Sequence, residues 1–334
     1  MNTKELNEVA LMMVAKGKGI LAADESTSTI EKRFNKIDLP NTEENRRAYR
    51  EMLFTSPNLG QHISGVIMYD ETLRRSTLDG RSFVSLLESM GVLPGIKVDQ
   101  GPYQMPDSLN EKLTKGLEGL PARLKEYREL GARFAKWRAV ITIGEGIPTD
   151  ENLRQNAKDL ASYARMCQEA GIVPIVEPEV LMDGTHSIAR CEEVSERTLT
   201  FVFEELKAAG VELSGMILKT NMVVSGKESG ENVTGEAVAD KTAALFRRVL
   251  PDELAGQAFL SGGQSEVEAT NNLNEINKRG PFPWPLTFSY GRALQDSALK
   301  TWAGKQENVE AAQKVFLKRA KLNGLAALGE YKGE

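Results

Sequence analysis

Ionisable residues in this sequence follow short runs of aliphatic residues, and several of them come in pairs. Three pairs have i, i+2 spacing, which places both side chains on one face of an extended strand. These pairs are Lys97 with Asp99, Lys136 with Arg138, and Glu177 with Glu179. Charged groups inside a protein are costly unless they are paired or used. We therefore interpret the pairs as parts of a catalytic or binding site.

Lysine is the nucleophile to consider in this set, because an unprotonated amine attacks carbonyl carbon. Burial and a neighbouring cation lower the pKa of a lysine and so supply the neutral amine. Lys219 follows the apolar run 215–218 (GMIL), and Lys136 lies in the apolar segment 134–142. These considerations leave Lys219 and Lys136 as alternative nucleophiles.

Acid and base groups accompany the lysines. Two like charges at close range raise the pKa of one carboxyl group, so the pair Glu177 and Glu179 includes a candidate proton donor at neutral pH. Asp24, after another apolar run, is a candidate base that stays ionised. Metal chemistry is not expected, because the chain has two histidines and no HExxH or paired-cysteine pattern.

Two glycine-containing segments predict phosphate binding. Ser261 and Gly262 begin a Ser-Gly-Gly segment whose backbone N–H groups can approach an anion closely, and Gly291 precedes Arg292, whose guanidinium suits phosphate. Further candidate cations are Arg33, Lys97 and Arg138. We therefore expect a substrate that carries phosphate at both ends.

Eight segments rich in β-branched and aliphatic residues alternate with helical patterns such as 152–170 and 237–250. The predicted strands are 19–24, 63–70, 93–99, 134–142, 172–180, 214–222, 257–263 and 286–292. This order predicts an α/β fold, a closed (β/α)8 barrel with an additional N-terminal helix at about residues 3–16, and one domain over 1–334. A doubly wound open sheet is the alternative, but no GxGxxG turn supports it.

Nearly every predicted strand ends in polar or ionisable residues. The C-terminal ends of barrel strands converge on one face, where such barrels form their active sites. Each of four ionisable residues lies two positions after another residue, on the same face of its strand, and we expect this face to point into the barrel. The four are Lys97, Lys136, Glu177 and Lys219. The residues two positions earlier are Gly95, Phe134, Ile175 and Ile217.

The composition excludes several other classes of function. A net charge of -5 gives no reason to expect binding to nucleic acid or to an anionic membrane. No run approaches the roughly 18 apolar residues that a membrane-spanning helix needs. Two cysteines in a long chain do not suggest a disulfide framework, so we expect a cytoplasmic protein.

Six motifs resemble those of class I fructose-1,6-bisphosphate aldolases. They are GILAADEST at 19–27, GIKVD at 95–99, FAKWR at 134–138, IVPIVEPE at 172–179, LSGGQSE at 260–266 and LTFSYGRALQ at 286–295. The resemblance extends from about residue 4 to 331. It implies a TIM-barrel lyase that reversibly splits fructose 1,6-bisphosphate into dihydroxyacetone phosphate and glyceraldehyde 3-phosphate, in glycolysis and gluconeogenesis. It also implies a homotetramer without metal or cofactor.

The resemblance assigns roles to the candidate residues. The motif ILKTNM at 217–222 matches the Schiff-base lysine of the family, which implies Lys219 rather than Lys136. Glu177, assisted by Glu179, then shuttles protons, Asp24 takes the proton of the C4 hydroxyl, and Lys136 supports developing charge. The matches to the site of the C1 phosphate are Ser261, Gly262, Gly291 and Arg292. The matches to the C6-phosphate region are Arg33, Lys97, Arg138, Ser26 and Thr29.

The sequence departs from the family pattern at its C-terminal end. Family members have a longer tail ending in a tyrosine that protonates the enamine, whereas this sequence stops at Glu334 and its Tyr331 matches an interior tyrosine. We expect Schiff-base formation to be retained and release of the enamine to be slower.

Two alternatives to this function remain. One is an enzyme that acts on a different substrate, and the other is a protein without catalytic activity. The first is another Schiff-base barrel enzyme, such as a transaldolase or a deoxyribose-phosphate aldolase, against which the two sets of phosphate-binding residues argue. The second is a non-catalytic scaffolding protein on the same barrel. Substrate preference distinguishes the first alternative, and an unreactive lysine distinguishes the second.

Overall fold

A computed structural model describes residues 2–108 and 110–334. A closed barrel of parallel strands lies at its centre, in the spatial order β1-β10-β9-β8-β7-β6-β3-β2. The barrel strands are β1 (Gly19–Ala23), β2 (Ile63–Met68), β3 (Leu93–Lys97), β6 (Phe134–Ile141), β7 (Val173–Val180), β8 (Ile217–Thr220), β9 (Gly256–Phe259) and β10 (Leu286–Tyr290). The predicted (β/α)8 barrel is confirmed.

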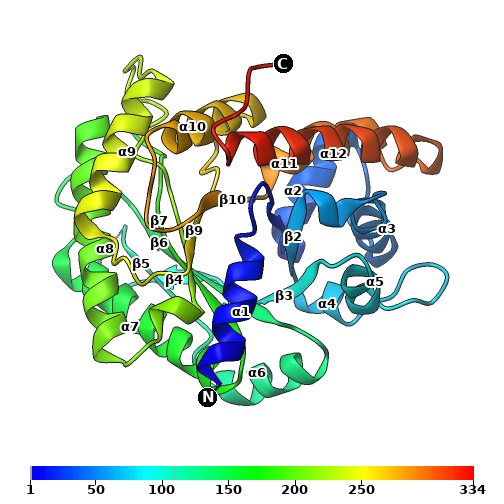
Figure 1. Ribbon diagram of the computed structural model, residues 1–334, viewed down its shortest axis with the longest axis horizontal. Helices are drawn as coiled ribbons and strands as arrows, with labels where there is room; N and C mark the ends of the chain where they lie inside the picture. Colours follow the sequence, from blue (N-terminus) through cyan, green and yellow to red (C-terminus); the bar gives the residue numbers. More distant parts are fainter. Residues whose placement is uncertain (1, 109) are drawn as a thin grey trace.

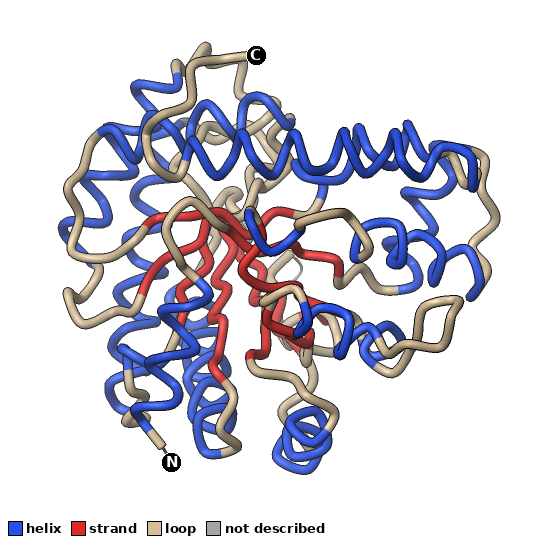
Figure 2. The backbone as a smooth tube through the Cα atoms, turned by 45° about the vertical axis from the view of Figure 1, so that its right-hand side comes forward, coloured by secondary structure: helices blue, strands red, loops and turns tan. Residues whose placement is uncertain are grey.

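Helices surround the barrel, as the ribbon and tube views show (Figures 1 and 2). They are α1 (Thr3–Met13), α2 (Thr27–Phe34), α3 (Glu43–Phe54), α4 (Asp70–Leu73), α5 (Phe83–Ser89), α6 (Leu120–Glu129), α7 (Asp150–Glu169), α8 (Ile188–Ala208), α9 (Gly235–Val249), α10 (Glu266–Lys278), α11 (Arg292–Trp302) and α12 (Val309–Ala326). Short 3₁₀ turns occupy Asn35–Ile37, Leu59–Gln61, Leu213–Gly215 and Gln306–Asn308. The additional N-terminal helix is confirmed, although it ends three residues before the predicted end.

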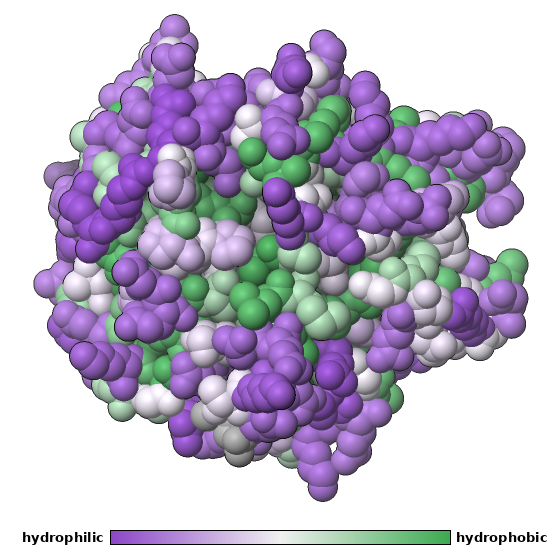
Figure 3. Space-filling model, in the orientation of Figure 1, coloured by the Kyte–Doolittle hydropathy of each residue, from purple (hydrophilic) through white to green (hydrophobic). Residues whose placement is uncertain are grey.

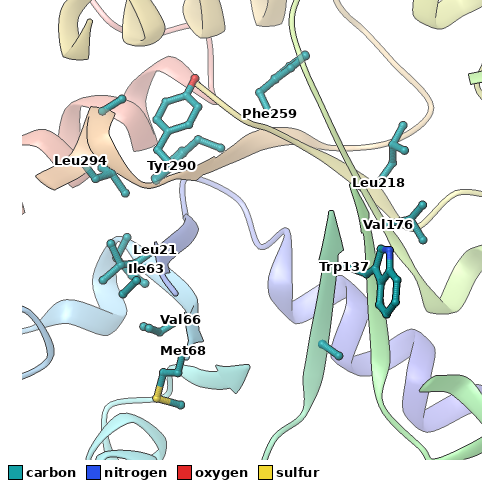
Figure 4. Close-up of a cluster of buried hydrophobic side chains, with 14 of the residues drawn as sticks. Leu21, Ile63, Val66, Met68, Trp137, Val176, Leu218, Phe259, Tyr290 and Leu294 are labelled. Carbon is teal, nitrogen blue, oxygen red and sulfur yellow. The ribbon is translucent and has the colours of Figure 1, made fainter. Parts of the chain in front are cut away.

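Alternation along each strand separates two apolar layers. Side chains of one parity pack outward against the helices, including Trp137, Val176 and Leu218, which Figure 4 shows beside the barrel strands. Side chains of the other parity, including Phe134, Ile175 and Ile217, form a separate buried cluster inside the barrel. The predicted inward direction of these residues is confirmed. Burial of both faces explains why the strands are almost continuously hydrophobic.

Helix α1 covers the N-terminal end of the barrel (Figure 1). Its buried residues Leu6, Val9, Ala10 and Met13 belong to the same apolar cluster as the interior residues Ile175 and Ile217. The helix begins at an Asn2 N-cap, whose side chain accepts a hydrogen bond from the Glu5 N–H. The apolar face of α1 therefore closes the N-terminal end of the barrel. The polar side chains of the interior lie at the opposite, C-terminal end.

Two glycines make room for a large side chain in the barrel interior. A Cβ atom at Gly95 would lie 2.2 Å from the ring of Phe134, and one at Gly65 would lie 2.9 Å from it. Such contacts are far inside normal packing distances. The strands β2 and β3 therefore need glycine where the Phe134 ring fills the barrel.

The strand ends differ from the predicted ones. Several ionisable residues that were predicted at strand ends lie just after the strands. Asp24 follows the end of β1 at Ala23, and Asp99 follows the end of β3 at Lys97, because strand pairing stops where these side chains line the cavity. The segment predicted as 214–222 is wrong at its start, where Leu213–Gly215 forms a 3₁₀ turn. A Cβ at Gly215 would lie 3.0 Å from Leu6 Cβ, so α1 packs closely against this turn.

The sequence did not predict a small antiparallel hairpin after β3. It consists of β4 (Pro102–Gln104) and β5 (Lys112–Thr114). Each strand has three residues, which is too short for the period-two pattern to be recognised.

The surface is largely hydrophilic around its periphery, and hydrophobic residues gather toward the centre of the face that Figure 3 shows. Among the described residues, none of the helices combines the length and apolarity that a membrane span requires.

Candidate active site

A cavity of about 870 Å³ lies at the C-terminal ends of the barrel strands. All of the predicted site residues line it. They are Asp24, Ser26, Thr29, Arg33, Lys97, Lys136, Arg138, Glu177, Glu179, Lys219, Ser261, Gly262, Gly291 and Arg292. Residues from seven of the eight barrel strands or the loops after them therefore meet at one place, as expected for the C-terminal face of such a barrel.

A chain of ion pairs crosses the floor of the cavity. Lys219 Nζ lies 3.0 Å from Glu177 Oε1, and Glu177 Oε2 lies 3.4 Å from Lys136 Nζ. Lys136 Nζ also lies 2.8 Å from Asp24 Oδ2. The side chains of Lys219, Glu177 and Lys136 are each 5% exposed. Both candidate lysines are buried, and one carboxylate contacts both.

The surroundings of these groups set their protonation states. Burial by itself would raise the pKa of Asp24, but the neighbouring Lys136 and Lys219 hold it well below its usual range. Burial would lower the pKa of Lys136, yet the carboxylates of Asp24, Glu177 and Asp99 raise it far above the ordinary lysine value. Lys136 is therefore firmly a cation, and Asp24 is firmly an anion at neutral pH.

Glu179 differs from the other carboxylates. Burial raises its pKa, and the nearby charge of Glu177 raises it further, while Arg138 opposes the shift. This direction agrees with the sequence prediction that one member of the glutamate pair favours the protonated form. Arg138 makes an ion pair with Glu179, and its side chain is 42% exposed. The guanidinium of Arg138 therefore lies between Glu179 and the open part of the cavity.

Lys97 is held beside Asp99 at the end of β3. Lys97 Nζ donates to the backbone carbonyl of Asp99 at 2.7 Å and lies 2.5 Å from Asp99 Oδ1. Burial lowers the pKa of Lys97, and Asp99 partly offsets the effect. The i, i+2 spacing of Lys97 and Asp99 thus allows the two side chains to form an ion pair at the cavity wall.

The predicted anion-binding segments follow β9 and β10, which lie across the barrel axis from β3 and its neighbour β6. Ser261 and Gly262 follow β9, and Gly262 has φ of +58°, a left-handed conformation that favours glycine. Gly291 lies between the end of β10 at Tyr290 and the start of α11 at Arg292, so the free N–H groups of a helix N-terminus lie in the same region. Arg292 is exposed, and it forms no ion pair with any described residue.

Arg33 depends on partners that the sequence reasoning missed. Its guanidinium forms an ion pair with the buried Glu25, and Arg50 Nη2 lies 2.5 Å from the other carboxylate oxygen of Glu25. Arg33 Nη1 also donates to Gln295 Oε1 at 3.4 Å. Glu25 follows Asp24 in the sequence, and its burial between two arginines depends on the approach of α2 and α3, which no local pattern reveals.

Ser289 is a second site residue that was missed. Its side chain lines the cavity, is buried, and has no hydrogen-bond partner among the described residues. Buried polar atoms are normally satisfied, so an unpartnered hydroxyl in a cavity wall suits contact with a ligand. Its i, i+2 spacing to Gly291 is the sequence signal that could have found it.

Ser26 and Thr29 lie at the rim. Ser26 immediately precedes α2, and its Oγ lies 3.1 Å from Thr29 Oγ1. Tyr331, by contrast, is 5% exposed, is not among the residues that line the cavity, and donates its N–H to Asn274 Oδ1.

The arrangement suits covalent catalysis at a carbonyl group. The carboxylate of Glu177 lies between two lysines, 3.0 Å from Lys219 Nζ and 3.4 Å from Lys136 Nζ. Further cationic side chains surround these three groups in the cavity. Three or more His, Cys, Asp or Glu side chains arranged to hold a metal ion do not occur among the described residues.

Comparisons with known proteins agree with this chemistry. The family model described as fructose-bisphosphate aldolase class-I matches residues 5–334. A probable fructose-bisphosphate aldolase class 1 of Xanthomonas campestris is 52% identical over 334 residues, which is 100% of both chains. The cytosolic fructose-bisphosphate aldolase 4 of Arabidopsis thaliana is 53% identical over 99% of this chain and 85% of its own length.

A solved structure is also similar. The fructose-bisphosphate aldolase of Plasmodium falciparum, in complex with TRAP and a small-molecule inhibitor, superposes with a TM-score of 0.98. The two chains are 51% identical, and the match covers 99% of this chain and 96% of that one.

Proposed function

Because the chain belongs to the class I fructose-bisphosphate aldolase family, we propose that Lys219 forms the Schiff base through which it acts. The protein is a lyase that reversibly cleaves fructose 1,6-bisphosphate to dihydroxyacetone phosphate and glyceraldehyde 3-phosphate, in glycolysis and gluconeogenesis. The single observation that supports Lys219 most is its buried amine, 3.0 Å from Glu177 and inside the barrel cavity.

The first half of the proposed reaction makes the imine. The Lys219 amine attacks C2 of the ketose and forms a carbinolamine. Glu177, which contacts both lysines, first takes a proton from Lys219 and so frees the amine that attacks. A second proton passes from the nitrogen to the C2 oxygen as the carbinolamine forms. Glu177 then gives its proton to the C2 hydroxyl, which leaves as water, and the protonated imine remains. Glu179, whose pKa burial raises, assists from two residues further along β7. Lys136 stabilises the oxygen on which negative charge develops.

The second half breaks the C3–C4 bond. Asp24, whose pKa the lysines lower, accepts the proton of the C4 hydroxyl. The electrons of the C3–C4 bond move toward the protonated imine and form an enamine, and glyceraldehyde 3-phosphate departs. Protonation of the enamine at C3 and hydrolysis of the imine then release dihydroxyacetone phosphate and restore Lys219.

Two groups of residues hold the phosphates in this proposal. The C1 phosphate is bound by Ser261, Gly262, Gly291 and Arg292. The C6 phosphate is bound by Arg33, Lys97, Arg138, Ser26 and Thr29. Support comes from their positions around the same cavity that contains the Lys219 amine. Ion pairs with Glu25, Asp99 and Glu179 hold the first three cations of the second group in place.

We further propose that catalysis needs no metal ion or cofactor, and that residues 1–334 form one domain that assembles as a cytoplasmic homotetramer. The class I family is metal-independent. Activity that survives a chelator supports the first proposal, and activity lost on metal removal contradicts it. Light scattering that gives four times the mass of 36.8 kDa supports the tetramer.

Substrate preference tests the proposed function. We expect cleavage of fructose 1,6-bisphosphate to exceed cleavage of fructose 6-phosphate and deoxyribose 5-phosphate, because both of the latter leave one phosphate site empty. Coupled assays with equal enzyme concentrations measure all three rates. Faster cleavage of either competitor would overturn the choice of substrate.

A further inference from the structure

The loop after β9 separates two depressions of the surface. Gly262 lines the barrel cavity, and the adjacent Gly263 lines a second depression of about 750 Å³, which also includes Lys227. Lys227 belongs to the loop between β8 and α9. The predicted anion-binding segment Ser261–Gly263 therefore lies between the barrel cavity and the depression that contains Lys227.

Lys227 lies directly over this segment. A Cβ atom built on Gly263 would be 2.7 Å from Lys227 Nζ and 3.4 Å from Arg292 Nη2. Two cationic nitrogens thus approach the same position beside Gly263. Gly263 has φ of +102°, a backbone conformation that favours glycine.

The backbone of Lys227 is fixed by the neighbouring loop after β7. The Lys227 N–H donates to the Met182 carbonyl at 2.8 Å, and the Gly226 N–H donates to the His186 carbonyl at 2.8 Å. The Glu228 N–H donates to the Gly184 carbonyl at 3.0 Å. Three consecutive residues are therefore tied to the loop after β7, which keeps the side chain of Lys227 near Gly263.

The charges around Lys227 leave it able to meet a second anion. Lys227 Nζ lies 2.9 Å from Asp183 Oδ1, and the two side chains are 38% and 66% exposed. An exposed ion pair of this kind contributes little stability. The ammonium can exchange Asp183 for a nearby phosphate without leaving a buried charge unpaired.

We propose that Lys227 is a further phosphate-binding residue, which acts with Arg292 on the phosphate at C1 of the substrate. This inference rests on the proposed function, because it takes the Ser261–Gly263 loop as the site of that phosphate. Lys227 supplies a second positive charge on the side of the loop opposite the barrel axis. Two cations around the backbone N–H groups bind a doubly charged phosphate better than one does.

The condensation reaction tests the proposal, because its two substrates carry different phosphates. Dihydroxyacetone phosphate brings the C1 phosphate, and glyceraldehyde 3-phosphate brings the C6 phosphate. We expect Lys227→Met to raise the KM for dihydroxyacetone phosphate about five- to tenfold, less than for a fully buried charged hydrogen bond. The KM for glyceraldehyde 3-phosphate should stay within twofold, and the first effect should shrink as salt increases.

Matched variants separate binding from structure. Lys241→Met removes a lysine that pairs with Glu192 at 2.6 Å outside the cavity, and it should change neither KM. Asp183→Asn breaks the same ion pair as Lys227→Met but keeps the cation, so it should not raise the KM for dihydroxyacetone phosphate. Lys227→Arg should restore most of the affinity.

Three results would overturn the proposal: equal increases of both KM values in Lys227→Met, an unchanged KM for dihydroxyacetone phosphate, or the same increase in Asp183→Asn. Thermal unfolding of each variant shows whether the loops remain folded, and Asp183→Asn provides the comparison if Lys227→Met is destabilised. Failure of the unmodified protein to cleave fructose 1,6-bisphosphate is a separate result and would contradict the proposed function itself.

Discussion

The two ends of the barrel interior differ in chemistry although the same strands form both. At the N-terminal end, Phe134, Ile175 and Ile217 pack with the apolar face of α1. Two residues further along each of these strands, the same face carries Lys136, Glu177 and Lys219. One end is buried and apolar, and the other is a charged cavity of about 870 Å³.

This difference shows how a barrel separates stability from chemistry. The apolar end fixes the strands, and burial of each large side chain there contributes about 1.5–3 kcal/mol. The charged end contains ion pairs whose net contribution to stability is small or unfavourable, because desolvation opposes their attraction. We expect substitutions at the charged end to change activity most and those at the apolar end to change stability most.

The largest expected effect is that of Lys219→Met, a change at the charged end. It removes the nucleophile and leaves Glu177 with Lys136 as a partner at 3.4 Å. We expect kcat to fall by at least about 10⁴-fold, because no other group can form the imine. Steady-state cleavage of fructose 1,6-bisphosphate measures it, and a loss of less than tenfold would place the nucleophile elsewhere.

Glu177→Gln should have the next largest effect. The amide keeps the shape of the side chain but cannot exchange a proton, so we expect kcat to fall about 10²- to 10⁴-fold. Formation of the imine should slow while the affinity for a phosphorylated competitive inhibitor changes little. Glu179→Gln is the matched control and should lose less activity. Equal losses in the two variants would contradict the separate roles given to them.

Phe134→Ala tests the apolar end. The ring fills the space left by Gly65 and Gly95, so its removal leaves a cavity, and we expect the free energy of unfolding to fall by about 3–5 kcal/mol. Below the unfolding temperature, kcat should change less than tenfold. Urea unfolding and kinetics at 25 °C measure both quantities. A large loss of activity with unchanged stability would show that the two ends are not separate.

The pH dependence of stability gives the smallest effect. The folded-state pKa of Asp24 is lowered by Lys136 and Lys219, so its stabilising contribution is present above the ordinary aspartate pKa and is lost as pH falls. We expect the free energy of unfolding of the unmodified protein to exceed that of Asp24→Asn by about 1 kcal/mol more at pH 6 than at pH 3. Urea titrations at a series of pH values measure the difference. A constant difference would contradict a lowered pKa.

The strands, and the positions of Lys136 and Lys219 in the cavity, could be predicted because they depend on local patterns. Lys136 and Glu177 each share alternation with an apolar residue two positions earlier, and strand geometry then places them inside the barrel. The motifs of the family separated Lys219 from Lys136, which no local pattern does. Glycine and arginine placed after strands predicted the proposed phosphate-binding segments, and these segments line the cavity.

Features that depend on approach between distant segments could not be predicted. Glu25 is buried between Arg33 and Arg50, which come from α2 and α3. The 3₁₀ turn at Leu213–Gly215 replaces the start of a predicted strand because α1 packs against it. Lys227 reaches Gly263 only because two loops are joined by backbone hydrogen bonds.

Chemical trapping of the intermediate tests the central claim most directly. Borohydride reduces an imine to a stable secondary amine, so the protein is treated with it in the presence of fructose 1,6-bisphosphate, digested and mapped by mass spectrometry. We predict a dihydroxyacetone phosphate adduct on the peptide that contains Lys219, and none on the peptide that contains Lys136. An adduct on Lys136 or on another residue, or the absence of any adduct, would contradict the mechanism.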